Sequence, residues 1–231
     1  MTATERNSIF TSGRIDLSNF HQVYSACIGP SMVIQEAASE KVVRNRDWFV
    51  DFERGTLSFG DEAFAVQFIG SESTEDNTWM WGWNNINGFP EDLISLANHL
   101  YSLGESFSLK ELTTPQLPLT DEVNAHSLGM IATVTSGANL AYYRGPHEYG
   151  SVLMCFPVPE EVYSPITWTR FIEVIQQCIM AGVDGRICVE SLLLWNGTPY
   201  DDEGNTITAH FPEKVTIEFD ELRRVAKITN A

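Results

Sequence analysis

Apolar and polar residues alternate at every second position along several short stretches in the first third of the chain. This period is that of a β-strand with one buried face. Gly55 and Gly60 lie in short polar segments between these stretches and can form the turns. The pattern predicts an antiparallel β-meander over about residues 47–84. The alternation is clearest at Trp48, Val50, Phe52, Phe64, Val66 and Phe68.

Other segments repeat their apolar residues with the helical spacing of three and four. They predict helices over about residues 16–28, 30–45, 91–103, 120–137 and 166–181. Gly29 and Pro30 separate the first two, because proline is tolerated mainly in a first helical turn. Further strands are expected at about 140–143, 151–156, 186–195, 206–211, 214–219 and 224–228.

Helices on either side of antiparallel strands indicate an α+β fold. Residues 1–15 carry no clear period, so we expect a flexible N-terminus there. The rest, 16–231, is expected to form a single α+β domain. Its order of helices and strands also allows two similar halves, at about 16–104 and 119–231, although no repeated sequence supports a duplication.

Three tryptophans occupy alternate positions in the stretch T-W-M-W-G-W-N-N at residues 78–85. A strand here would project Trp79, Trp81 and Trp83 from one face. Two interpretations follow. The indoles can form a stacking platform, with Asn84 and Asn85 contacting a ligand where the strand ends. Alternatively, the indoles fill the core beneath helices and the asparagines form a turn.

The chain is strongly acidic, with 31 Asp and Glu against 14 Lys and Arg and a net charge of −17. Such a field repels nucleic-acid phosphates and anionic membranes, so we expect neither as a partner. A basic protein is compatible with it. Glu72, Glu75 and Asp76 lie just before the tryptophan stretch, where they could form an acidic rim for such a partner. The alternative is an ordinary solvated turn.

Motifs of known catalytic or cofactor-binding classes are missing from the sequence. The five histidines form no HxH or HExxH pair, so no metal site is expected, and no cofactor is expected without a GxGxxG or Walker A loop. Cys27, Cys155, Cys178 and Cys188 form no CxxC pair and are interpreted as free buried thiols. The polar N-terminus and the lack of a long apolar segment lead us to expect a cytoplasmic protein.

Three motifs in order resemble an uncharacterised bacterial domain family with a T-W-x-W-x-W-x-N signature. They are W-F-V-D-F at residues 48–52, Q-F-I-G at 67–70 and the tryptophan stretch at 78–85. The resemblance covers roughly residues 40–157. It implies a shared fold and brings no activity, because the family has no established function.

These observations favour a non-enzymatic binding or interaction protein that uses the acidic rim and the aromatic strand. A toxin-neutralising role is suggested only by analogy with other small acidic proteins. The alternative is a small hydrolase of unrecognised class, whose site would assemble from His126 or His147 with nearby acids. A purely structural or oligomer-forming role also stays open.

Overall fold

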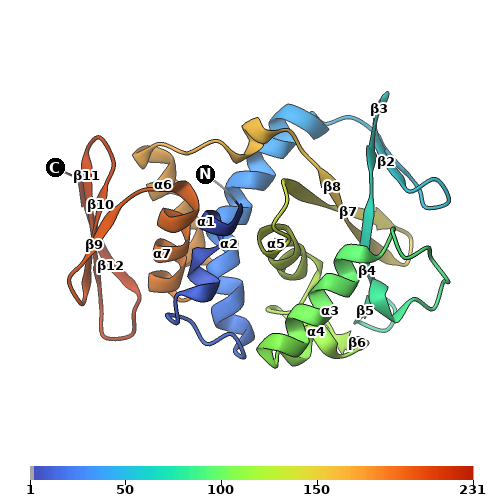
Figure 1. Ribbon diagram of the computed structural model, residues 1–231, viewed down its shortest axis with the longest axis horizontal. Coiled ribbons are helices and arrows are strands. Elements are labelled where there is room, and N and C mark those ends of the chain that lie inside the picture. Colours follow the sequence, from blue (N-terminus) through green and yellow to red (C-terminus); the bar gives the residue numbers. More distant parts are fainter. Residues whose placement is uncertain (1–2, 231) are drawn as a thin grey trace. The chain divides into compact units, whose positions relative to one another are not determined.

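The computed structural model describes residues 3–230, and the chain divides into two compact units (Figure 1). The first unit combines Met1–Val33 with Ser164–Ala231, and the second is Ile34–Tyr163. The boundaries of these units differ from those of the two halves, 16–104 and 119–231, considered above. That residues 16–231 form a single domain stays a prediction. Among the described residues, no helix is long and apolar enough to cross a membrane.

The second unit contains two antiparallel sheets and the helices that cover them, so the α+β prediction is confirmed. Its strands are β1 Trp48–Asp51, β2 Thr56–Phe59, β3 Glu62–Ala65, β4 Gln67–Ser73, β5 Thr78–Trp81, β6 Gln116–Pro118, β7 Leu140–His147 and β8 Gly150–Pro157. Its helical segments are η2 Ser39–Val43, η3 Gly82–Asn84, α3 Ser95–Phe107, α4 Lys110–Thr113, α5 Ala125–Thr135 and η4 Glu160–Tyr163.

The strands expected as one meander belong to two sheets. Strands β1, β2 and β3 form a three-stranded sheet, whereas β4 and β5 join a five-stranded sheet in the order β6-β5-β4-β8-β7. The chain passes from one sheet to the other at Val66, whose amide donates to the Gly55 carbonyl at 3.0 Å. Sequence alternation continues across Val66 and therefore does not reveal the change of sheet.

Helices α5 and α3 cover the five-stranded sheet (Figure 1). Gly129 of α5 allows close approach, because an added Cβ would lie 2.7 Å from the Tyr142 ring of β7. Strand β7 is an edge strand, and its outer backbone groups are satisfied by side chains. The Gln35 amide bonds both the N–H and the carbonyl of Tyr142, at 3.0 and 2.8 Å. Capping of this kind blocks the addition of another strand.

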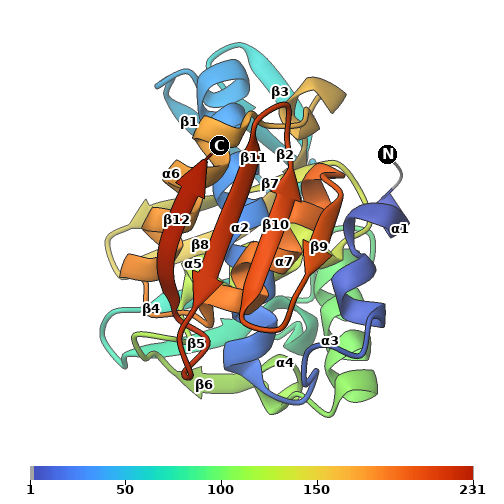
Figure 2. The ribbon, with the colours of Figure 1, turned by 90° about the vertical axis from the view of Figure 1, so that its left-hand side faces the viewer.

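The first unit pairs helices with a four-stranded antiparallel sheet in the order β12-β11-β10-β9 (Figure 2). The buried face of this sheet carries Ile207, Ala209, Val215, Ile217 and Phe219. Its elements are α1 Ala3–Arg6, η1 Ser8–Thr11, α6 Trp168–Met180, α7 Gly185–Asn196, β9 Tyr200–Asp202, β10 Thr206–His210, β11 Lys214–Phe219 and β12 Val225–Asn230. The strands expected at 206–228 are thus present.

The strand expected at 186–195 is wrong, because this segment is helix α7. Asp184 caps its start by accepting from the Ile187 amide at 3.0 Å, and Gly197 ends it at φ +72°. The helix is buried on nearly every side, so its sequence lacks the polar face that produces a helical period. The two caps were the signal that could have identified it.

The break expected at Gly29 and Pro30 is also wrong. A single helix, α2 Phe20–Ala38, continues through Pro30. Proline removes the N–H that would bond the carbonyl four residues earlier, which here is that of Ala26. The Ser191 hydroxyl donates to this carbonyl at 2.5 Å instead. A tertiary contact therefore offsets the lost helical bond, and no local sequence pattern reports it.

Residues 9–15 pack within the first unit. Ile9 and Ile15 are buried in a cluster with Ala26 and Ile187. The lack of a hydrophobic period in residues 1–15 did not predict this packing. Two isolated isoleucines are enough to anchor a short segment, and they produce no period. The flexibility expected there remains a prediction.

Candidate functional site

The tryptophan stretch lies on β5 and on the 3-10 turn that follows it. Trp79 is fully buried, Trp81 is 2% exposed, and their rings meet edge to face with centroids 5.3 Å apart. The Trp81 indole donates from Nε1 to the Glu111 carbonyl at 2.9 Å. Neither indole offers a face to solvent, so the core interpretation holds for these two and the stacking platform is wrong for them.

Trp83 departs from the expected alternation, because the strand ends at Trp81 and Gly82 begins η3. An added Cβ at Gly82 would lie 2.9 Å from the Phe68 ring, so glycine allows the chain to turn this close to Phe68. Trp83 is half-buried and packs edge to face on Tyr101 of α3, with centroids 4.7 Å apart. The third indole therefore fixes α3 to the end of β5.

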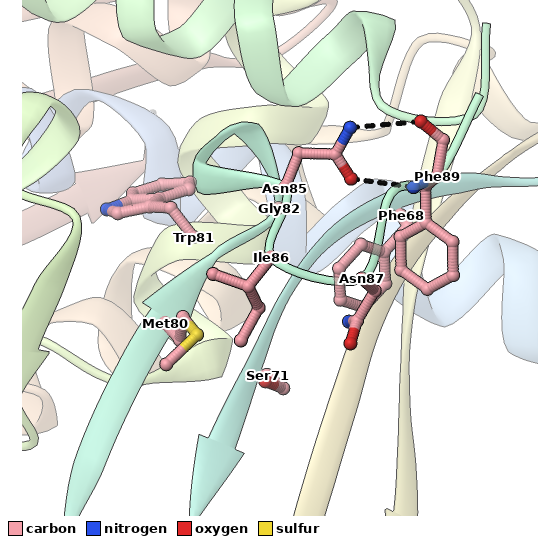
Figure 3. A pocket seen from close by; sticks show the side chains of 9 residues that line it. All are labelled: Phe68, Ser71, Met80, Trp81, Gly82, Asn85, Ile86, Asn87 and Phe89. Atoms are coloured by element: carbon pink, nitrogen blue, oxygen red, sulfur yellow. Dashed lines mark hydrogen bonds between the residues drawn. The ribbon is translucent and has the colours of Figure 1, made fainter. Parts of the chain in front are cut away.

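Asn84 and Asn85 lie at the strand exit, as expected. Asn84 is exposed, whereas Asn85 closes a turn by bonding both the amide and the carbonyl of Phe89, at 2.7 and 3.0 Å (Figure 3). The hollow beside this turn holds only about 10 Å³, room for a single water. The arrangement matches the turn interpretation of the asparagines, and their role in ligand binding stays a prediction.

Glu72 is not part of an exposed rim. It lies on β4 opposite Trp79 and is 7% exposed. Its carboxylate accepts from the Ala125 amide at the start of α5 and from the Ser151 hydroxyl of β8, both at 2.7 Å. It also forms an ion pair with Arg144 of β7, at 2.8 Å. One buried carboxylate thus ties β4 to α5, β7 and β8.

Burial raises the pKa of Glu72, but its hydrogen bonds and the charge of Arg144 outweigh burial and lower the pKa below 4.5. His126 follows Ala125 in α5, and its Nδ1 lies 3.1 Å from the Tyr142 hydroxyl. Burial and Arg144 lower the His126 pKa below 6.5. The alternative of a hydrolase needs an accessible nucleophile here, yet the Ser151 side chain is fully buried.

Three loops meet at the end of the five-stranded sheet near Glu72. They are residues 74–77 between β4 and β5, 119–124 after β6, and 148–149 between β7 and β8. Backbone hydrogen bonds of 2.9 Å join neighbouring loops, from Thr74 N to Tyr149 O and from Leu119 N to Asn77 O. Segments far apart in the sequence therefore form one continuous edge, which we call the acidic end.

The acidic end carries exposed carboxylates from all three loops, at Glu75, Asp76, Asp121 and Glu148. The loops contain no lysine or arginine. Tyr149 lies among them and is 62% exposed, so a large aromatic surface adjoins the carboxylates. The structure thus places an exposed aromatic residue on the loop next to that of Glu75 and Asp76, but it is Tyr149 and not a tryptophan of β5.

The remaining candidate groups are the cysteines and His147. All four cysteines are free and buried, as predicted. Burial raises the pKa of the Cys155 thiol to about 12 and also raises that of Cys27. Within residues 3–230, no group of three or more His, Cys, Asp or Glu is arranged to hold a metal ion. His147 is exposed and its Nδ1 accepts from the Tyr149 amide at 3.2 Å.

Sequence reasoning missed Asp121, Glu148 and Tyr149 as members of this edge. Each lies in a short polar loop that looks ordinary by itself. Strand order brings the loops together, and the order β6-β5-β4-β8-β7 is not visible in the pattern of a single chain. The only local signal was that all three loops are acidic and lack basic residues.

A family of proteins described as a family of unknown function (DUF6882) matches residues 21–159, more than half of the chain. The matched region contains the tryptophan stretch, Glu72 and the whole acidic end. The resemblance to an uncharacterised domain family is confirmed, whereas the signature motif and the bacterial source stay predictions. No curated protein and no solved structure matches the chain.

Proposed function

We propose that the chain, which belongs to this family of unknown function, is a non-enzymatic protein that binds a basic protein partner at the acidic end. Because the family brings no known activity, the proposal rests on the geometry of the molecule. The observation that carries the proposal is the presence of exposed Glu75, Asp76, Asp121, Glu148 and Tyr149 on three loops joined by backbone hydrogen bonds, with no lysine or arginine in them. Complementary charge speeds encounter and selects the partner.

The charge balance of the chain supports this surface. Many of its basic residues are already ion-paired within the fold, so they do not screen the acidic end. Arg144 of β7 pairs with buried Glu72. The other pairs involve Arg14, Arg46, Arg54, Arg170, Arg186, Arg223, Arg224 and Lys227.

Tyr149 adds an apolar contact surface, which charged groups alone do not provide. Tyrosine is enriched among residues that dominate binding energy, because it buries a large apolar surface and keeps a hydroxyl for hydrogen bonding. Carboxylates around an aromatic residue form the usual polar rim of an interface. The proposed contact is therefore a tyrosine anchor with an acidic surround, and the aromatic strand β5 supports it from the interior.

Two parts of the sequence-based hypothesis stay predictions. A toxin-neutralising role would be one case of binding a basic protein, and the acidic end supports it only to that extent. The hydrolase alternative has His126 close to Tyr142, but the Ser151 hydroxyl that bonds to Glu72 is fully buried. The structure offers more support to binding than to catalysis.

The test is a capture experiment on an extract of the source cells at low and high salt, followed by association kinetics with the purified partner. Glu75→Lys with Asp76→Lys should slow association, and the difference should shrink as salt screens charges beyond ~8–10 Å. The matched control is Glu160→Lys with Glu161→Lys, two exposed acids of the same unit that lie away from these loops. Both variants change net charge equally.

Two results would overturn the proposal. One is the failure of any basic protein to bind at low salt. The other is an association rate that falls equally in the two variants, since that would reflect overall charge and not this surface.

A further inference from the structure

A second hollow lies away from the three loops of the acidic end, and neither the family nor the proposed function accounts for it. Its volume is about 430 Å³, within the range of small-molecule sites. Three segments of the second unit enclose it. They are residues 52–55 after β1, residues 65–67 where the chain leaves β3 for β4, and residues 90–93 before α3.

Hydrogen bonds fix these three walls to one another. Val66 N donates to Gly55 O at 3.0 Å, and Phe68 N donates to Leu93 O at 2.8 Å. The Gln67 side chain donates to the Asp92 carbonyl at 2.7 Å and accepts from Leu96 N at 2.9 Å. A hollow held in this way is formed before a ligand arrives, which reduces the entropy lost on binding.

The lining combines an aromatic ring with apolar side chains. Phe52 is half-buried and packs edge to face on Phe68 with centroids 5.4 Å apart, and Phe89 lies 5.3 Å from it. Pro90 and Leu93 add apolar surface. The ring of Phe52 is therefore fixed in position, as a binding surface for an apolar group requires.

The charged groups at the hollow favour a cation. Glu53 and Asp92 are exposed, and within the described residues their carboxylates have no hydrogen-bond or ion-pair partner. Arg54 also lines the hollow, but its guanidinium pairs with Asp51 at 3.5 Å. Two unpaired carboxylates and one guanidinium that is already paired thus line the hollow, in a chain that carries a net charge of −17.

We propose that this hollow binds an organic cation, with an ammonium, amidinium or guanidinium group on an apolar body. The cation lies between the carboxylates of Glu53 and Asp92, and the apolar body packs on Phe52, Pro90 and Leu93. Aromatic rings attract cations, so Phe52 serves both parts of the ligand. The same chemistry is offered by a free amine and by an arginine side chain of another protein.

The test uses ¹⁵N-labelled full-length protein and three probes of one shape: benzylamine, neutral benzyl alcohol and anionic benzoate. Benzylamine should move the amide signals of Gly55, Val66 and Leu93 in a saturable way at millimolar concentration. Glu53→Gln with Asp92→Asn should weaken this binding roughly tenfold, because two charge-assisted contacts are lost. The control, Glu160→Gln with Glu161→Gln, should bind as the parent does.

A blocked Phe-Arg dipeptide separates the two sources. Tighter binding by the dipeptide than by benzylamine identifies a protein side chain as the ligand, and weaker binding identifies a free amine. The inference is overturned if benzyl alcohol or benzoate moves the same signals as strongly, if benzylamine moves none of them, or if the Glu53 and Asp92 double variant binds like its control. Variants at Glu75 and Asp76 should not alter this binding. The proposal for the hollow and the proposal for the acidic end are therefore tested independently.

Discussion

The hairpin of β4 and β5 has an interior part and an exposed tip, and acids occupy both. Glu72 in the interior part accepts from Ala125 and Ser151 and pairs with Arg144. Glu75 and Asp76 at the tip are exposed. These acids are separated by only three or four positions, yet one joins four elements of the fold and the others are exposed to solvent, where the proposed partner would meet them.

Acids that are close in sequence can thus lie in opposite environments. Glu72 lies on the same face of β4 as Gly70, where charge is tolerated only because donors surround it. Beyond Ser73 the sheet ends and water solvates each carboxylate. Replacements in the interior part should therefore change stability, and replacements at the tip should change association.

The largest effect should follow Trp81→Ala. This removes a buried indole and its bond to Glu111, and should lower the free energy of unfolding by ~3–5 kcal/mol. Chemical denaturation measures the loss. Trp83→Ala is the matched control and should cost less, because Trp83 is only half-buried. A melt of Trp81→Ala that equals that of the parent would show that this indole is not a core residue.

Next comes Glu72→Gln, which keeps the shape of the side chain and removes its charge. Arg144 then loses its partner, and the free energy of unfolding should fall by about 2–4 kcal/mol. The lower part of this range is favoured since the Arg144 side chain is 34% exposed. Glu75→Gln should stay within ~0.5 kcal/mol of the parent. Equal losses in the two variants would remove the distinction between interior and tip.

The third prediction concerns pH. The pKa of Glu72 is lowered in the folded protein, so its ionised form stabilises the fold fully above 4.5, the ordinary value. This stabilisation is lost as pH falls through the folded pKa. The difference in unfolding free energy between the parent and Glu72→Gln should therefore be constant near neutral pH and shrink below pH 4.5. A difference that grew in acid would mean that the pKa is raised.

The smallest effect on stability is expected for Tyr149→Ala, within ~0.5 kcal/mol, because Tyr149 is largely exposed. Its effect on binding should be large by comparison. If Tyr149 is the anchor, the partner should dissociate at least roughly tenfold faster. Phe49→Ala is the control, since Phe49 is 68% exposed and lies outside the acidic end. Equal dissociation rates in the two variants would place the contact elsewhere.

Elements with a clear pattern of buried and exposed positions were predicted from the sequence. Elements that depend on contacts with distant parts of the chain were not. Amphipathic helices and hairpins were predicted, because one side faces water and the other the core, as in α6 and in β10 with β11. Helix α7 was missed because it is buried almost all round. Pro30 was misjudged because the hydroxyl that compensates for it belongs to Ser191, far away in the chain.

The candidate site shows the same limit. That Glu75 and Asp76 are exposed follows from their place in a polar turn, and it was expected. That Glu72 is buried depends on Arg144 and Ser151, which are more than seventy positions away. Tyr149 joins the site only because β8 pairs with β4. Partners this distant leave no trace in local periodicity.

The most direct measurement is a map of amide chemical shifts in ¹⁵N-labelled protein as a short lysine-rich peptide is added, repeated at high salt. The affected residues should be those of the three loops, 74–77, 119–124 and 148–149, with Tyr149 among the largest shifts. These shifts should disappear at high salt, because salt screens the charges. Shifts that are as large at Glu160 and Glu161 as at Glu75 and Asp76 would contradict the existence of a defined acidic site.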